Sequence, residues 1–223
     1  GYIVAGWTKS NDGDVSGWHE GKDWQGKPTS DFWVVKLDGE GNIEWQKCLG
    51  GSEADEAYSV AITPDGGYIV AGQTLSNDKN VSGKHAGLGD FWVVKLDGEG
   101  NIIWKRCLGG SNVDEAYSIA VTPDGGYIVA GYTYSNDGDV SGNHGGGDFW
   151  VVKLDSDGNV VWQKCLGGSD DEEACSIAVT PDGKYIVAGY TESNNGDVSG
   201  WHEGYDESGY PYSDFWIVKL GWK

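Results

Sequence analysis

Two apolar runs recur along the chain, and neither has the length or the 3.6-residue period of a helix. The run Y-I-V-A-G begins at residues 2, 68, 127 and 185, and the run D-F-W-(V/I)-V-K-L begins at residues 31, 90, 148 and 214. Both runs are rich in β-branched and aromatic residues, and both are bounded by Gly, Pro, Asn or Asp, which is typical of a strand between turns. This pattern predicts an all-β protein.

Two further runs complete a repeat of roughly 60 residues. The first resembles A-Y-S-I-A-V-T (116–122) and precedes the turn P-D-G-G, and the second resembles V-V-W-Q-K-C-L-G-G (160–168) and follows D-S-D-G-N. Each of these two runs occurs three times, so the chain should contain 14 strands. The A-Y-S-I-A-V-T run is apolar at most positions, which predicts a strand enclosed on both faces. The predicted units are 1–54, 55–113, 114–171 and 172–223.

Four short antiparallel strands in each repeat predict a β-propeller, whose blades are such sheets arranged around an axis. The units resemble the β-propeller repeats of large secreted bacterial and archaeal surface proteins. The resemblance implies one propeller domain or propeller segment over residues 1–223, with about four incomplete blades, on a secreted or cell-surface protein. It also implies that the first blade lacks its innermost strand and the last blade its outermost one. Three alternatives follow: a piece of a longer array, an imperfect four-bladed ring, or a ring completed by a second chain.

The net charge limits the partners that are expected, and the spacing of the cysteines indicates how they pack. The chain of 223 residues has 35 acidic and 15 basic residues, a net charge of −20, which argues against nucleic-acid partners and against binding to anionic membranes. No apolar run is long enough to span a bilayer, so membrane insertion is not expected. Cys48, Cys107 and Cys165 occupy equivalent positions one repeat apart, which predicts buried apolar packing rather than disulfides.

The loop after the Y-I-V-A-G strand is the candidate metal site. It reads S-N-D-G-D-V-S-G at 10–17 and at 135–142, and S-N-N-G-D-V-S-G at 193–200. Closely spaced carboxylates with an intervening Gly can bring several oxygens to one Ca²⁺ ion. The candidate ligands are Asp12, Asp14, Asp137, Asp139 and Asp197. The alternative is a turn in which Asn and Asp side chains bond to backbone N–H groups. The histidine that follows each loop should bond to the backbone of a neighbouring loop.

Two of the four copies carry a long insertion before the D-F-W strand, at 18–30 and 201–213. Aromatic rings flanked by carboxylates and amides can stack on sugars or hold a peptide. The candidate ligand-binding residues are Trp18, Trp24, Trp201, Tyr205, Tyr210 and Tyr212. If the ring closes, the two insertions should meet on one face. The alternatives are that the rings pack their own loop or form a contact between chains.

No nucleophile elbow, phosphate loop or zinc-protease motif is present, and nearly every polar feature is repeated in each unit, whereas one active site needs an asymmetric cluster. The sequence therefore predicts a non-catalytic extracellular binding or scaffold module with a glycan or a peptide or protein as its ligand. Stabilisation by Ca²⁺ is a further hypothesis, and no other cofactor is expected. One alternative is an assembly protein with chain–chain contacts through strand edges and loops, as a homo-oligomer or within a longer parent chain. A second is a carbohydrate-active enzyme that uses the acidic face.

Overall fold

The computed structural model describes residues 1–202, 204–205 and 212–221, and this part of the chain forms four antiparallel sheets without a helix. The first sheet has the order β1 (Tyr2–Thr8), β2 (Asp31–Leu37), β3 (Ile43–Leu49). The second has the order β4 (Asp55–Ile62), β5 (Tyr68–Thr74), β6 (Asp90–Leu96), β7 (Ile102–Leu108). The third has the order β8 (Asp114–Val121), β9 (Tyr127–Thr133), β10 (Asp148–Leu154), β11 (Val160–Leu166). The fourth has the order β12 (Glu172–Val179), β13 (Tyr185–Thr191), β14 (Asp214–Leu220).

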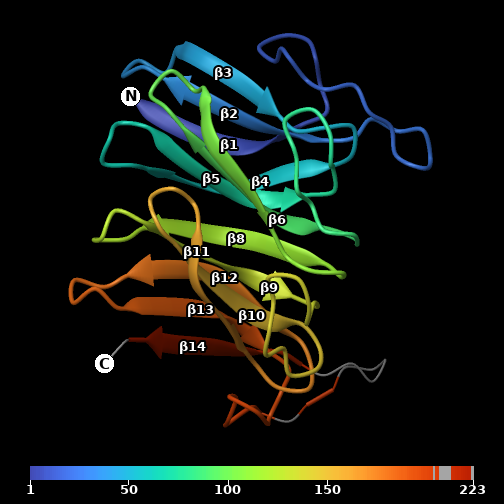
Figure 1. Ribbon diagram of the computed structural model, residues 1–223, viewed down its shortest axis with the longest axis vertical. Coiled ribbons are helices and arrows are strands. Elements are labelled where there is room, and N and C mark those ends of the chain that lie inside the picture. The colour runs from blue at the N-terminus through green and yellow to red at the C-terminus, as the bar shows by residue number, and fades with distance from the viewer. Residues whose placement is uncertain (203, 206–211, 222–223) are drawn as a thin grey trace.

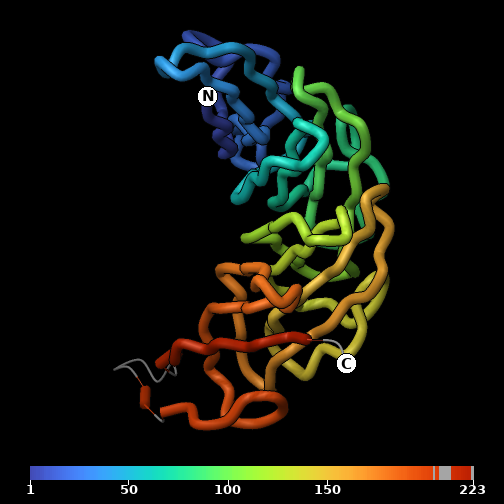
Figure 2. Tube along the Cα trace, turned by 90° about the vertical axis from the view of Figure 1, so that its left-hand side faces the viewer, coloured from blue at the N-terminus to red at the C-terminus, as the bar shows by residue number. Residues whose placement is uncertain are grey.

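The predicted all-β class and the 14 strands are thus confirmed. The first and last sheets have three strands each: the first has no counterpart of β4, and the last has no counterpart of β7. The four sheets follow one another along a crescent (Figures 1 and 2). Strands β4, β8 and β12 contact one another across the sheets. In Figure 2, β8 lies on the concave side of the crescent and β11 on the convex side.

Because the second and third sheets are covered on both faces by their neighbours, their middle strands are the most buried. All seven residues of β6 and of β10 are buried. The sequence predicted that the inner strands are enclosed on both faces, and this prediction is wrong. Strands β4 and β8 are partly exposed because they border the concave side. Each inner strand has a register shift near its middle, as between Ala57 and Ser59 in β4. The bulge turns one side chain, Tyr58 in β4, away from the ladder.

Aromatic pairs fasten each sheet to the next. The ring of Phe32 lies 4.6 Å from that of Trp92, and the same contact recurs between Phe91 and Trp150 at 4.5 Å. It recurs a third time between Phe149 of the third sheet and Trp216 of the fourth, at 4.7 Å. A second series joins Trp45, Trp104 and Trp162 to a tyrosine of the following sheet at 5.7, 5.7 and 6.0 Å. These tryptophans therefore pack between sheets.

The three repeated cysteines are buried and free, so they pack as small apolar side chains. Burial raises the pKa of the Cys48 thiol to about 11, and the Asp31 carboxylate nearby contributes to the rise. No helix in the described part of the chain is long and apolar enough to cross a membrane.

Candidate ligand-binding site

The repeated S-N-D-G-D loop clamps the Gly-Gly turn of the preceding sheet. Asp137 Oδ1 accepts a hydrogen bond from the Ser111 N–H at 2.7 Å, and Asp139 Oδ2 accepts one from the Gly109 N–H at 3.4 Å. The Asp139 N–H in turn donates to the Gly109 carbonyl at 2.9 Å. The Asp197 N–H donates to the Gly167 carbonyl in the same way, also at 2.9 Å. These aspartates thus have a structural role at the junctions between sheets.

Asp12 and Asp14 lie in the first copy of the loop, where no sheet precedes them, and both side chains are exposed. The candidate metal ligands therefore occupy three separate loops. Among the described residues, no three His, Cys, Asp or Glu side chains come close enough together to hold a metal ion. Calcium binding by these loops stays a prediction that the geometry neither requires nor tests.

Each histidine pairs with the aspartate that opens the D-F-W strand of its own unit. The distances from Nδ1 to the carboxylate are 2.7 Å for His19–Asp31, 2.8 Å for His85–Asp90, 2.6 Å for His144–Asp148 and 2.8 Å for His202–Asp214. The prediction that each histidine bonds to the backbone of a neighbouring loop is therefore wrong. A carboxylate competes better for an imidazole N–H than a neutral carbonyl does, because a charge-assisted hydrogen bond is stronger.

A second carboxylate lies beside three of these aspartates, Asp31, Asp90 and Asp148, which are buried. A Cβ added to Gly50 would lie 2.5 Å from Asp55 Oδ2 and 2.7 Å from Asp31 Oδ1, so the two acids flank this glycine. Burial raises the pKa of Asp55 to about 6, although Thr74, Gly51 and Ser76 donate hydrogen bonds to its carboxylate. The pKa of Asp114, the equivalent of Asp55 in the third sheet, rises to about 6 for the same reason. The buried pair thus recurs at the junctions between successive sheets, and burial disfavours its charged form.

Phenol–carboxylate pairs follow the inner strands. The Tyr58 hydroxyl donates to Glu56 at 2.8 Å, and the Tyr117 hydroxyl donates to Glu115 at 3.0 Å. The two rings are 5.2 Å apart, and Tyr132 and Tyr134 continue the row at 5.8 and 5.6 Å. Sequence reasoning missed these pairs. The signal was the D-E-A-Y run at 55–58 and 114–117, because residues i and i+2 of a strand share a face.

The first aromatic insertion is closed on itself. Trp18 Nε1 donates to the Thr29 carbonyl at 3.0 Å, which joins the two ends of the loop. Between these ends, a bridge from Lys22 to Pro28 forms a small hairpin. Trp24 lies within this hairpin and is 90% exposed. Trp18 therefore holds the loop, and Trp24 is the aromatic ring of this insertion that a ligand could reach.

The second insertion uses the same closure and adds an aromatic pair. Trp201 Nε1 donates to the Tyr212 carbonyl at 2.8 Å, and the Trp201 and Tyr205 rings meet edge to face at 6.2 Å. Tyr205 and Tyr212 are more than half exposed. Tyr210, also predicted as a ligand residue, lies outside the described residues. The two insertions belong to the first and the fourth sheet, at opposite ends of the crescent, so within the described chain they do not meet (Figure 1).

A hollow of about 250 Å³ lies beside Trp201 and Tyr205. Its remaining lining residues are Asp170, Glu192, Asn194 and Asn195. Burial and the nearby Asp171 and Asp170 raise the pKa of Glu192. No Lys or Arg is among the lining residues, so the hollow offers two aromatic rings, two amides and two acids.

The equivalent place in the third unit is also hollowed, with a volume of about 440 Å³, and it is lined by Asn112, Tyr134, Asn136, Asp137 and Asn143 among others. There Asn143 stands in place of Trp201 and Tyr134 in place of Glu192, so among these two hollows the Trp–Tyr pair belongs to the fourth unit. Burial and the nearby acids, Glu192 among them, raise the pKa of Tyr134 and of Tyr190.

Comparison with known proteins gives little functional information. No family model matches the chain. It is similar to the regulatory protein FlaEY of Caulobacter vibrioides, with 27% identity over 196 residues that cover 81% of this chain and 20% of that protein. A protein of unknown function from Bacteroides caccae is a weak structural match, with a TM-score of 0.45 and 14% identity over 86% of this chain and 65% of that one. The chain thus spans about a fifth of its curated relative.

Proposed function

We propose that the four sheets are consecutive blades of a β-propeller and that the chain is a non-catalytic binding module of a secreted or cell-surface protein. The crescent of antiparallel sheets, with the inner strands side by side on its concave side, supports this proposal. The carboxylate pairs do not favour catalysis, because they recur at the junctions between successive sheets, whereas one active site needs an asymmetric cluster. Among the described residues, the pairing of Trp201 with Tyr205 sets the insertion of the fourth unit apart, and a single ligand would bind there.

The ligand that suits this insertion is a neutral glycan. The observation that supports this ligand is the lining of the hollow, in which the rings of Trp201 and Tyr205 adjoin Glu192 and Asp170 and no basic residue is present. Aromatic faces pack against the apolar C–H face of a sugar, while carboxylates and amides accept and donate hydrogen bonds to its hydroxyls. A phosphate or carboxylate ligand would meet uncompensated negative charge, because opposite charge is what favours buried anions.

The test is titration of the chain with a panel of neutral and acidic oligosaccharides, followed by calorimetry on each sugar that binds. Tyr205→Ala and Glu192→Gln should each weaken binding about five- to thirtyfold, since each removes a contact worth about 1–2 kcal/mol. Trp24→Ala is the control: it removes a still more exposed ring from the other insertion and should leave the affinity unchanged. Binding of a peptide library instead, or an equal response to all three variants, would contradict the proposal. Release of new reducing ends from a bound sugar would contradict the non-catalytic part.

A further inference from the structure

Within the described residues, strand β14 is hydrogen-bonded on one side only. In the second and third sheets the corresponding strands, β6 and β10, lie between two neighbours, whereas in this part of the chain β14 pairs with β13 alone. The burial of β14 alternates between intermediate and exposed along its length, whereas every residue of β10 is buried. A free edge of this kind presents unpaired N–H and C=O groups to any extended segment that approaches it.

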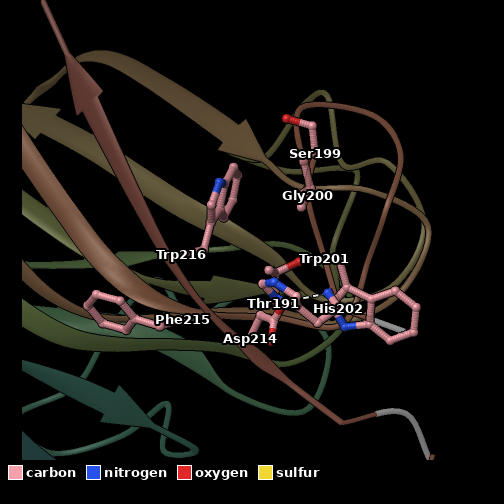
Figure 3. Close-up of a pocket in the computed structure, with 9 residues that line it drawn as sticks. Thr191, Ser199, Gly200, Trp201, His202, Asp214, Phe215 and Trp216 are labelled. Atoms are coloured by element: carbon pink, nitrogen blue, oxygen red, sulfur yellow. Dashed lines mark hydrogen bonds and ion pairs between the residues drawn. The ribbon is translucent and has the colours of Figure 1, made fainter. Parts of the chain in front are cut away.

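A hollow of about 320 Å³ lies against this edge. Figure 3 shows Trp216, Ser199 and Gly200 around it, with the His202–Asp214 contact at one end. In the third sheet the strand β11 covers the matching positions, because Leu166 pairs with Phe149 and Cys165 pairs with Trp150. Both Cys165 and Leu166 are buried there, at 4% and 3% exposure. The equivalent of Phe149 in the fourth sheet, Phe215, is 73% exposed.

A hydrogen-bonded bridge through a glutamine accompanies the apolar contacts in the sheets that have the additional strand. In the third sheet Trp150 Nε1 donates to Gln163 Oε1 at 2.8 Å, and Gln163 Nε2 donates to the Ser141 carbonyl at 3.1 Å. The first sheet repeats this bridge, with Gln46 between Trp33 and Ser16. Trp216 and Ser199 are the equivalent pair in the fourth sheet. Among the described residues, Trp216 Nε1 has no hydrogen-bond partner.

We infer that the β14 edge binds an extended segment of the pattern Trp-Gln-x-Cys-Leu, which adds as a fourth, antiparallel strand in the register of β11. Its Leu packs beside Phe215, its Cys beside Trp216, and its Gln bridges Trp216 Nε1 and the Ser199 carbonyl. The backbone ladder supplies affinity, and the side chains that alternate into the hollow supply selectivity. The occupant is thus a strand of the same chemistry as β3 and β11. The inference is independent of the proposed glycan site, although Trp201 lines both hollows.

The probe is a fluorescein-labelled peptide with the sequence of residues 160–168, VVWQKCLGG, added to the chain under reducing conditions while fluorescence polarisation is recorded. Saturable binding is expected. A Leu→Ala peptide should bind at least tenfold more weakly, because it loses the buried side chain. The sequence offers a matched control in residues 102–110, IIWKRCLGG, where Lys105 replaces the glutamine. A VVWKKCLGG peptide should bind about tenfold more weakly than VVWQKCLGG, which corresponds to one hydrogen bond.

Trp216→Phe keeps the ring and removes the donor, so this variant should bind the Gln and Lys peptides equally well. Absence of binding, or a preference for Gln that survives in Trp216→Phe, would overturn the inference. Light scattering at the same concentrations addresses the competing occupant. A dimer joined through β14 that excludes the peptide would show that the edge takes a second copy of the chain, and would also overturn it.

Discussion

The stability of this protein should be greatest in mild acid and should fall as the pH rises toward 7. The perturbation that tests this is Asp55→Asn at the junction between the first and second sheets. Asp55 is fully buried and faces Asp31 across Gly50, and burial raises its pKa from the usual 3.8 to about 6. An asparagine in its place can still accept the hydrogen bonds from the Gly51 N–H and the Ser76 hydroxyl, and it has no charge to lose or gain.

The sign follows from which state holds the proton. With the folded-state pKa raised above the unfolded value, the folded protein binds more protons between pH 3.8 and about 6, so the free energy of unfolding falls as the pH rises through that window. A pKa that is roughly two higher in the folded than in the unfolded state corresponds to about 3 kcal/mol in the free energy of unfolding for one carboxyl group. For a domain of this size that is a fall in Tm of about 6–12 °C. The pKa of His85 is also raised, through its hydrogen bond and charge interaction with Asp90, and the stability it contributes is lost as the pH rises through its folded-state pKa, in the same direction.

The opposite trend sets the acid limit. Asp65 and Asp124 accept hydrogen bonds in exposed turns that lower their pKa to about 2, so their contribution is present above the usual 3.8 and is lost as the pH falls through about 2. The optimum should therefore lie near pH 4–5. The assay is urea unfolding of wild type, Asp55→Asn and the control Asp38→Asn at pH 4.5, 5.5 and 7. Wild type and the Asp38 variant should lose stability together between pH 4.5 and 7, and Asp55→Asn should lose about 2 kcal/mol less, because part of the total of about 3 kcal/mol is already lost at pH 4.5. Equal slopes for all three proteins, or a wild type that gains stability toward pH 7, would refute the reasoning.

Three further predictions concern packing and metal. Trp92 Nε1 is buried without an acceptor, because Lys105 stands at the position where Gln46 and Gln163 accept the hydrogen bonds of Trp33 and Trp150. Lys105→Gln should therefore raise the free energy of unfolding in urea by about 1–2 kcal/mol, and Lys105→Met should not. Phe91→Ala should cost about 3–5 kcal/mol because Phe91 is fully buried against Trp150, while Phe215→Ala, at an exposed equivalent position, should cost less than about 1 kcal/mol; an equal loss would contradict the packing account. If Asp12 and Asp14 bind Ca²⁺, calcium at 100 times its Kd should raise the free energy of unfolding by about 2.7 kcal/mol, and Asp12→Asn should abolish this gain. An unchanged Tm after chelation would show that these loops do not bind the metal.

The sequence predicted the strands well because each one carries its own signal. The Y-I-V-A-G and D-F-W runs are bounded by turn residues at both ends, and glycines such as Gly66 and Gly125 take positive φ where the P-D-G-G turns require it. Repetition gave two or three further estimates of every boundary.

The inner strands and the polar partners were harder to predict. A run such as A-Y-S-I-A-V-T carries apolar side chains on both faces, but only the stacking of the sheets decides that one edge of β8 borders the concave side. The histidine partners were missed because the loop lengths differ: His85 lies 5 residues before Asp90, whereas His19 lies 12 residues before Asp31. Burial of that aspartate, which makes it the preferred partner, depends on contacts between sheets that lie far apart in the sequence.

The contrast between repeated and unrepeated features bears most directly on function. The His–Asp pairs, the carboxylates beside Gly50 and the aspartates of the S-N-D-G-D loops recur from sheet to sheet, and the hydrogen-bond partners that they have belong to their own unit or to the adjacent one. Asp31 Oδ1 and Asp90 Oδ1 are buried without a partner. A ligand that bound through them would have several equivalent sites. The Trp201–Tyr205 pair and the Trp216–Ser199 edge occur in the fourth unit, where the repeat is broken by an insertion and by the end of a sheet. Substitutions at these two places should therefore change binding while leaving the melting temperature near that of wild type, and substitutions in the repeated set should do the reverse.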